Sequence, residues 1–255
     1  MKLKVLGCSG GIGGARRRTT AYLVDHDILL DGGSGVGDLD YEDLLRIDHV
    51  FVTHAHLDHV AFIPFLVDTV GEERGRPITV YGNAETLRIL RSHLFNWLIW
   101  PDFSTIPDRR APFLRYQEVR VGEAVQLGDR TIRPMSALHT VPALGYCLDS
   151  GEGKLVYTGD TTYSDELLVE INALSDLRYL IVESAFPDAQ QGLALASRHM
   201  CPNLLTRLLE RVEGNPEVLV THLKPGKGER IMSELVSYHG RLVPRRLEAG
   251  MELTF

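Results

Sequence analysis

Four side chains with metal-binding chemistry lie within six residues, in the segment His-Ala-His-Leu-Asp-His that begins at His54. An apolar run precedes this segment and predicts a strand that leads into it. On nearly extended backbone, residues two apart project to the same side, so His54 and His56 face one point. Asp58 and His59 open the next predicted helix, where neighbouring residues project about 100° apart. Three imidazoles and one carboxylate so close together suit two adjacent metal ions better than a single tetrahedral ion.

The alternatives for this segment are a surface histidine cluster or a helix cap made by Asp58. The apolar strand before it and the tight spacing favour the metal site. The chain has ten histidines but only three cysteines, Cys8, Cys147 and Cys201, which are far apart and not in CxxC spacing. This pattern argues against a disulfide framework and against a thiolate zinc finger. We therefore expect nitrogen and oxygen ligands.

The HxHxDH motif after a strand resembles the metallo-β-lactamase superfamily. The resemblance runs from the turn at Asp31 to His222. It implies an α/β fold, a four-layer αβ/βα sandwich, with a two-metal site at one edge of the paired sheets. Three further ligand positions of that family match His139, Asp160 and His222, each of which directly follows a predicted strand. Read alone, each of these residues could be structural, and the joint pattern is what favours the metal site.

The resemblance also implies how the ligands are shared between two divalent ions. One ion is expected on His54, His56 and His139, the second on Asp58, His59 and His222, with Asp160 between them. Two divalent ions about 3.5–4 Å apart can hold a bridging hydroxide near neutral pH, which makes hydrolysis the expected reaction. Imidazole and carboxylate ligands suit zinc, our first choice, and also manganese or iron.

The superfamily cleaves lactams, lactones, thioesters and phosphodiesters, so the fold alone does not select a substrate. The segment Ser-Arg-His-Met-Cys-Pro, which contains His199, favours phosphodiesters. The class II cyclic-nucleotide phosphodiesterases and the ribonuclease Z group, which this sequence resembles, both carry a histidine at this point. We expect His199 to contact phosphate and to act as general acid, with the start of the following helix attracting the anion. The alternative is a surface histidine that caps this helix.

The finer resemblance is to the cyclic-nucleotide phosphodiesterases. It rests on Asp-Gly-Gly-Ser-Gly-Val-Gly from Asp31, on Val-Glu-Ser-Ala-Phe-Pro around Glu183, and on Thr-His-Leu-Lys-Pro. The sequence departs from that group's signature at Phe62 and Val67. Asp31 and Glu183 are expected to orient ligand histidines from behind.

The amino-acid composition limits which classes of substrate and partner we expect. The 255 residues carry 27 basic and 34 acidic side chains, a net charge of −7, which argues against a nucleic acid and for a small phosphodiester. No apolar run is long enough for a signal peptide or a membrane span, so we expect a cytoplasmic protein. No linker divides the chain, so residues 1–255 are expected to form a single domain, and the family resemblance makes a homodimer plausible.

Three other functions stay open from the sequence. A ribonuclease Z-like endonuclease is the first, a hydrolase of the same fold with another substrate is the second, and an iron-dependent oxidoreductase is the third. The glycine-rich loop from Gly7 is not followed by a βα unit, so we interpret it as a rim of the site and not as a dinucleotide loop. Arg16, Arg17 and Arg18 after it could contact phosphate or form a solvated turn.

Strands and helices alternate along the chain. Strands are expected at residues 3–7, 21–25, 27–31, 49–53, 78–81, 115–122, 131–138, 145–148, 155–158, 179–183, 218–221 and 251–255. Helices are expected at residues 40–47, 60–70, 83–100, 165–174, 201–212 and 227–239. The stretch 95–113 carries three prolines and reads as an irregular excursion, a lid or a rim.

Overall fold

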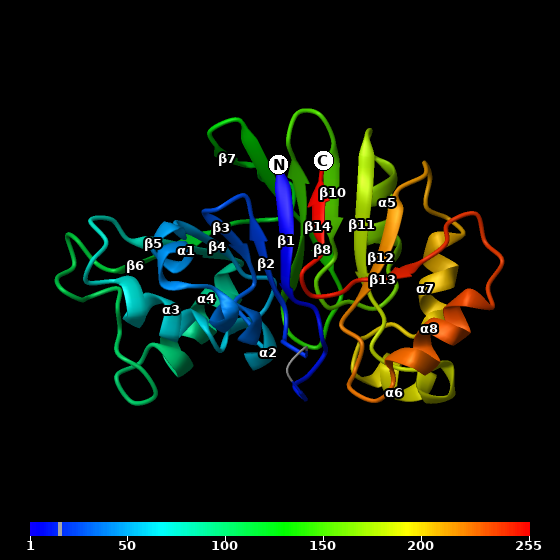
Figure 1. The fold of residues 1–255 in the computed structure, drawn as a ribbon, viewed down its shortest axis with the longest axis horizontal. Helices are drawn as coiled ribbons and strands as arrows, with labels where there is room; N and C mark the ends of the chain where they lie inside the picture. The colour runs from blue at the N-terminus through cyan, green and yellow to red at the C-terminus, as the bar shows by residue number, and fades with distance from the viewer. Residues whose placement is uncertain (15–16) are drawn as a thin grey trace.

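Two mixed sheets pack face to face and are flanked by helices on both outer sides, which gives four layers (Figure 1). The structure is a computed structural model, and it describes residues 1–14 and 17–255. The four-layer α/β sandwich expected from the resemblance is confirmed. Among the described residues, no helix is both long and apolar enough to span a bilayer.

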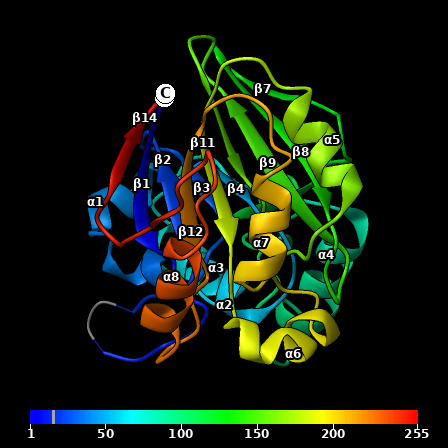
Figure 2. The ribbon, with the colours of Figure 1, turned by 90° about the vertical axis from the view of Figure 1, so that its right-hand side faces the viewer.

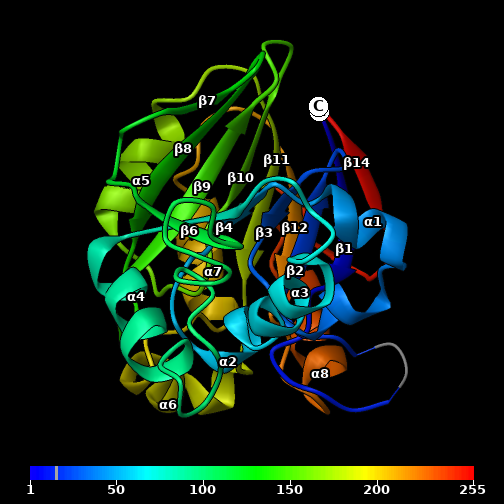
Figure 3. The same ribbon diagram turned by 90° about the vertical axis from the view of Figure 1, so that its left-hand side faces the viewer.

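The first sheet has seven strands in the order β14-β1-β2-β3-β4-β5-β6. Their bounds are β1 (Lys2–Gly7), β2 (Ala21–Val24), β3 (Ile28–Leu30), β4 (His49–Phe51), β5 (Ile78–Gly82), β6 (Leu114–Glu118) and β14 (Glu252–Thr254). The helices of this half are α1 (Tyr41–Arg46), α2 (Leu57–Val60), α3 (Ile63–Val70) and α4 (Ala84–Ile89). They cover the outer face of the sheet and its lower edge (Figure 3).

The second sheet also has seven strands, in the order β13-β12-β11-β10-β9-β8-β7. Their bounds are β7 (Val125–Leu127), β8 (Arg130–Ala137), β9 (Ala143–Asp149), β10 (Lys154–Tyr157), β11 (Leu177–Glu183), β12 (Glu217–Thr221) and β13 (Arg245–Arg246). Its helices are α5 (Asp165–Asn172), α6 (Gln191–Ala196), α7 (Pro202–Leu209) and α8 (Gly228–Val236). Helices α5, α7 and α8 cover the outer face, and α6 lies below it (Figure 2).

Both sheets repeat one pairing pattern. From β14 to β6, and again from β7 to β13, three antiparallel pairs are followed by three parallel pairs. Parallel strands all end at the same edge of a sheet, and ligand sites form beyond their carboxyl ends. The loops after β3, β4, β10, β11 and β12 therefore converge on one edge of the sandwich.

A core of buried apolar side chains joins the two sheets. Phe51 of β4 stacks on Tyr81 of β5 with ring centroids 4.2 Å apart, and it meets Tyr146 of β9 edge-on at 5.5 Å. Two further apolar clusters fill the space between each sheet and its own helices. Strands such as β3 are consequently buried on both faces, which explains their unbroken apolar runs.

The helices begin at side chains that cap them. Asp40 accepts a hydrogen bond from the backbone N–H of Asp43 at 2.9 Å and starts α1, as expected from the sequence. Asn83 and Ser164 start α4 and α5 in the same way. Each cap satisfies a donor that the first helical turn leaves unpaired.

The helix expected over 83–100 is too long. Helical winding ends at Leu94, after one turn of π-helix (η2, Leu90–Leu94). The Asn96 side chain then accepts hydrogen bonds from the N–H groups of Leu98 and Ile99, and this closes a turn in place of a helix. Asn side chains compete with helix in this way. The short strands β7 and β13 and helix α6 were also not anticipated.

The excursion after η2 packs against the first half of the molecule. Phe95 and Phe103 are buried in the cluster beneath α3 and α4. Trp97, Leu98 and Ile99 between them stay 63%, 88% and 63% exposed. The segment is thus anchored by its phenylalanines, while its tip faces solvent.

Candidate metal centre

All seven residues expected as metal ligands meet at the edge of the sandwich where α2 and α6 lie (Figure 1). They come from four separate stretches of chain: the β4–α2 segment, the β8–β9 loop, the end of β10 and the end of β12. Topology explains this convergence, because each of these stretches follows a strand that ends at this edge.

The first group consists of His54, His56 and His139. His56 Nδ1 lies 3.0 Å from His54 Nε2 and 3.3 Å from His139 Nε2. Nitrogen ligands at about 2.0 Å in a tetrahedral site stand about 3.3 Å apart, so these spacings match a single divalent ion. Burial lowers the pKa of His139 to about 4 and that of His54 well below its usual value. Both rings are therefore neutral at pH 7, the form that binds metal.

The second group consists of Asp58, His59 and His222, whose ligand atoms lie within 4.8 Å of one another. Asp58 Oδ2 is 3.9 Å from His59 Nε2 and 4.0 Å from His222 Nε2. His59 Nε2 and His222 Nδ1 are buried without a hydrogen-bond partner. Buried polar atoms are rarely left unpaired, and a cation in this space would satisfy them.

Asp160 lies between the two groups. Its Oδ2 is 3.4 Å from His59 Nε2 and 3.8 Å from His54 Nε2, while its Oδ1 is 3.2 Å from His222 Nδ1. Burial raises the pKa of Asp160, but the attraction of His222 and His59 outweighs it and lowers that pKa well below its usual value. The carboxylate is thus ionised and touches both groups.

Asp31 lies behind the cluster and contacts one of the expected ligands, His59. This buried carboxylate accepts a hydrogen bond from the N–H of Thr53 at 2.7 Å and another from the hydroxyl of Tyr157 at 3.0 Å. Its Oδ2 also lies 2.8 Å from Nδ1 of His59. Thr53 Oγ1 in turn lies 3.0 Å from His54 Nδ1. Burial lowers the pKa of His59, but Asp160 and Asp31 outweigh it and raise that pKa well above its usual value. This negative environment attracts a proton or a metal cation alike.

The glycine-rich loop holds His222. The N–H of His222 donates to the carbonyl of Cys8 at 2.9 Å, and the N–H of Gly10 donates to the carbonyl of Leu223 at 3.2 Å. A Cβ at Gly10 would stand 2.5 Å from the carbonyl oxygen of His222. The sequence interpretation placed this loop at the rim of the site. At Gly10 its close neighbour is the backbone of an expected ligand.

His199 lies against the same cluster. Its ring stacks on His222 with centroids 5.1 Å apart and meets His139 edge-on at 4.9 Å. Glu183 Oε1 is 2.7 Å from His199 Nδ1, so this carboxylate supports His199 and not one of the expected ligands. Burial lowers the pKa of His199, but the charge and hydrogen bond of Glu183 outweigh it, and the pKa lies above its usual value.

Two details of the sequence interpretation change here. The N-terminus of α7 was expected to attract an anion, but Asp188 Oδ1 already accepts from the N–H of Asn203 at 2.7 Å. Of the three arginines that follow the glycine-rich loop, Arg16 lies outside the described residues. Arg18 forms an ion pair with Asp38 at 2.8 Å, which occupies its charge.

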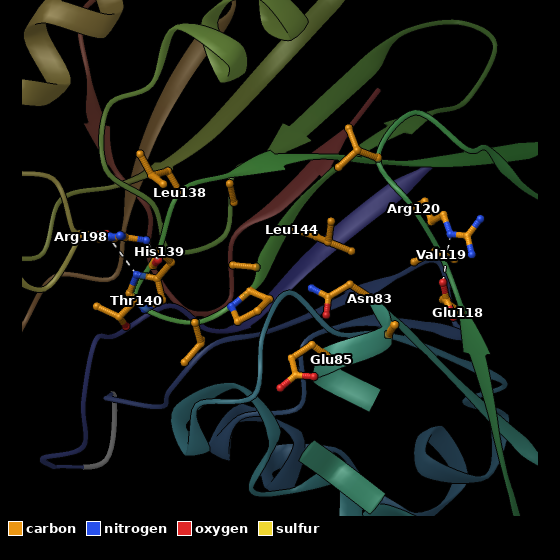
Figure 4. Close-up of a pocket in the computed structure, with 16 residues that line it drawn as sticks. Asn83, Glu85, Glu118, Val119, Arg120, Leu138, His139, Thr140, Leu144 and Arg198 are labelled. Carbon is orange, nitrogen blue, oxygen red and sulfur yellow. Dashed lines mark hydrogen bonds and ion pairs between the residues drawn. The ribbon is translucent and has the colours of Figure 1, made fainter. Parts of the chain in front are cut away.

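A groove of about 660 Å³ begins at His139 and runs under the β8–β9 loop (Figure 4). Arg198 lies beside His139 at one end, and Glu118 and Arg120 lie at the other. Val119, Leu144 and other apolar side chains form much of its wall. This volume is within the range of pockets for small organic ligands.

Three residues that contact the expected site were not predicted from the sequence: Thr53, Arg198 and Tyr157. Thr53 directly precedes His54 and Arg198 directly precedes His199, so their positions in the two motifs could have indicated them. Arg198 contacts His139 both through its backbone carbonyl and through its side chain. Tyr157 lies in an apolar strand, and no local pattern marks its hydroxyl as a partner of Asp31.

Residues 28–223 match the family described as Beta-lactamase superfamily domain. The chain belongs to this superfamily. Membership implies divalent-metal binding, which fits the donor set described above. Relatives that the chain matches include a probable phosphodiesterase, a ribonuclease Z and a probable metallo-hydrolase.

Over 203 residues the chain is 29% identical to a probable 3',5'-cyclic-nucleotide phosphodiesterase of Yersinia pestis, covering 70% of this chain and 57% of that protein. It is 31% identical to a ribonuclease Z of Haloarcula marismortui, covering 60% of this chain and 49% of that protein. The chain thus spans only about half the length of these two relatives.

The probable metallo-hydrolase YhfI of Bacillus subtilis is 27% identical, with 88% of this chain and 87% of that protein covered. The crystal structure of YhfI, a metallo-beta-lactamase fold protein, superposes with a TM-score of 0.79 and 22% identity. This superposition covers 99% of this chain and 98% of that chain. It supports the fold alone, over nearly the whole chain.

Proposed function

We propose that this protein hydrolyses a small phosphodiester, with a 3',5'-cyclic nucleotide as the first candidate, at a centre of two divalent metal ions. The observation that carries the proposal is Asp160, which touches both ligand groups, beside His199. Bound divalent ions would lower the pKa of water and stabilise charge on phosphoryl oxygens. Zinc is the first choice of metal, because imidazoles dominate both groups.

The chain's own residues have separate tasks in this proposal. His54, His56 and His139 would hold one ion, and Asp58, His59 and His222 would hold the other, while Asp31 fixes the orientation of His59. His199, whose pKa is raised by Glu183, contacts a phosphate oxygen and donates a proton to the departing alcohol oxygen. The groove that begins at His139 receives the organic part of the substrate.

A ribonuclease Z-like endonuclease is the second candidate, because of the 31% identity to the Haloarcula protein. The net charge of −7 favours the small substrate, because contacts between basic side chains and phosphates supply much of the affinity of a protein for nucleic acid.

The test is a substrate panel given to the zinc-loaded protein: cyclic AMP, cyclic GMP, bis-nitrophenyl phosphate, a tRNA precursor, a thioester and a lactone. We expect cleavage of the three small phosphodiesters, loss of it in Asp160→Ala, and full activity in the exposed control Asp68→Asn. Cleavage of the tRNA precursor over cyclic AMP would select the second candidate. Turnover of only the thioester or the lactone would overturn both.

A further inference from the structure

Arg198 and His139 form a reciprocal pair of hydrogen bonds across 59 residues of sequence. The Nδ1 of His139 lies 3.1 Å from the backbone carbonyl oxygen of Arg198. In return, Nη1 of Arg198 donates to the backbone carbonyl oxygen of His139 at 2.6 Å. Each residue therefore uses its side chain to bind the backbone of the other, and Figure 4 shows the two side chains next to each other.

This arrangement selects one form of the His139 ring. A carbonyl oxygen only accepts hydrogen bonds, so Nδ1 of His139 must carry the proton. The other ring nitrogen, Nε2, then keeps its lone pair, and it lies 3.3 Å from Nδ1 of His56 within the first ligand group. A hydrogen bond at one imidazole nitrogen commonly fixes which nitrogen binds metal.

The backbone of Arg198 has an unusual conformation. Its φ is +51°, in the left-handed region that residues other than glycine rarely adopt. The next residue is held independently, because the N–H of His199 donates to Ala194 at 2.9 Å and its ring meets Glu183. This φ lets the backbone carbonyl of Arg198 accept a hydrogen bond from His139, while the ring of the next residue, His199, keeps its hydrogen bond to Glu183. A strained residue at such a place indicates a constraint that the surroundings maintain.

We propose that Arg198 is the positioning residue of His139, which fixes its tautomer and its place in the first metal group. This inference rests on the proposed two-metal centre. The Arg198 side chain is exposed, whereas the ring that it positions is buried. Its removal thus leaves the core intact, and the effect on His139 can be separated from an effect on folding.

Three variants test the inference. Arg198→Gly keeps the carbonyl and tolerates the positive φ, but it removes the guanidinium bond to His139. Arg198→Lys supplies an ammonium group that can donate a hydrogen bond to the same carbonyl of His139, from a side chain of different shape. Arg115→Ala, at an exposed arginine on β6, is the matched control.

The first measurement titrates each full-length protein with Co²⁺ and records the visible absorption of the bound ion. We expect two equivalents in the unmodified protein. In Arg198→Gly, one equivalent should bind about 10–100-fold more weakly with an altered spectrum, while the other is unchanged. Arg198→Lys should recover part of the loss, and Arg115→Ala should match the unmodified protein.

The second measurement needs no metal. Nitrogen-15 shifts of the His139 ring should report a single tautomer with the proton on Nδ1 in the unmodified protein and in Arg198→Gly, because both keep the backbone carbonyl at residue 198. A proton on Nε2 in the unmodified protein would overturn the tautomer assignment. If Arg198→Gly binds two Co²⁺ equivalents with unchanged affinity and spectrum, the inference about Arg198 is wrong and the proposed centre stands. If the unmodified protein binds fewer than two equivalents, the proposed centre and the inference both fail.

Discussion

Oδ2 of Asp31 lies 2.8 Å from Nδ1 of His59, and both side chains are fully buried. The carboxylate occupies one ring nitrogen, so only Nε2 of His59 is left to face Asp58 and Asp160. Because Asp31 also accepts from Thr53, whose hydroxyl lies next to His54, one carboxylate orients a ligand of each proposed ion.

Substitution of Asp31 should therefore weaken metal binding without removing any ligand. In Asp31→Asn, the amide nitrogen would face the N–H of Thr53 or the ring of His59, so at least one contact is lost. We expect the affinity for divalent metal to fall by about 10–100-fold. A competition titration with a chelating dye measures this. The exposed Asp68→Asn is the control, and equal affinities in the two variants would contradict the role of Asp31.

Gly10 should be irreplaceable for steric reasons. In Gly10→Ala the new Cβ would stand 2.5 Å from the carbonyl oxygen of His222, which is backbone and cannot rotate away. We expect a loss of stability of about 1–3 kcal/mol and loss of the ion held by the second group. Urea unfolding and metal analysis check the two effects. Gly75→Ala, where a Cβ meets no atom within 4 Å, should be nearly neutral in both. Retention of both ions by Gly10→Ala would argue against this account of the loop.

The segment from His54 to His59 could be predicted from its own spacing. The fold and the roles of His139, Asp160 and His222 were predicted from the resemblance to the superfamily, since each of these three residues follows an apolar strand but carries no decisive signal alone. The partner of Glu183 could not be predicted, since the path from β11 through α6 decides which histidine it meets. The end of the helix at Leu94 could not be predicted for a different reason: the apolar residues that follow Leu94 fit a helical pattern as well as they fit a turn.

An ion pair between the sheets gives a prediction for pH. Arg130, at the start of β8, binds both oxygens of Asp27 in the β2–β3 turn, at 2.6 and 2.7 Å. Burial raises the pKa of Asp27, but the hydrogen bonds and charge of Arg130 outweigh it, so the pKa is lowered. A carboxyl whose pKa is lower in the folded state stabilises the fold above its unfolded pKa, about 3.9, and loses this contribution as the pH falls through the folded value.

We therefore expect Arg130→Met to cost on the order of 2 kcal/mol between pH 5 and 7. This cost should shrink below pH 4, as Asp27 becomes protonated in both proteins. Urea unfolding at several pH values measures the difference. Arg120→Met, which removes the exposed pair with Glu118, should cost less than about 1 kcal/mol at every pH. A cost for Arg130→Met that is the same at pH 3 and pH 7 would refute this interpretation.

The role of His199 as proton donor predicts a dependence on the leaving group. Alkoxide leaving groups need a proton, so His199→Ala should reduce kcat for cyclic AMP by about 10²–10⁴-fold. Nitrophenolate leaves without a proton, so the reduction for bis-nitrophenyl phosphate should be much smaller. Steady-state kinetics with both substrates provides the comparison. Equal losses for the two would assign His199 to phosphate binding alone.

The central claim is that two metal ions share Asp160. Isothermal titration of the metal-free protein with Zn²⁺, together with elemental analysis after dialysis, tests it most directly. The account predicts two equivalents for the unmodified protein and fewer than two retained by Asp160→Ala, because this carboxylate touches both ligand groups. A single equivalent in the unmodified protein, or two retained by Asp160→Ala with unchanged affinity, would contradict it.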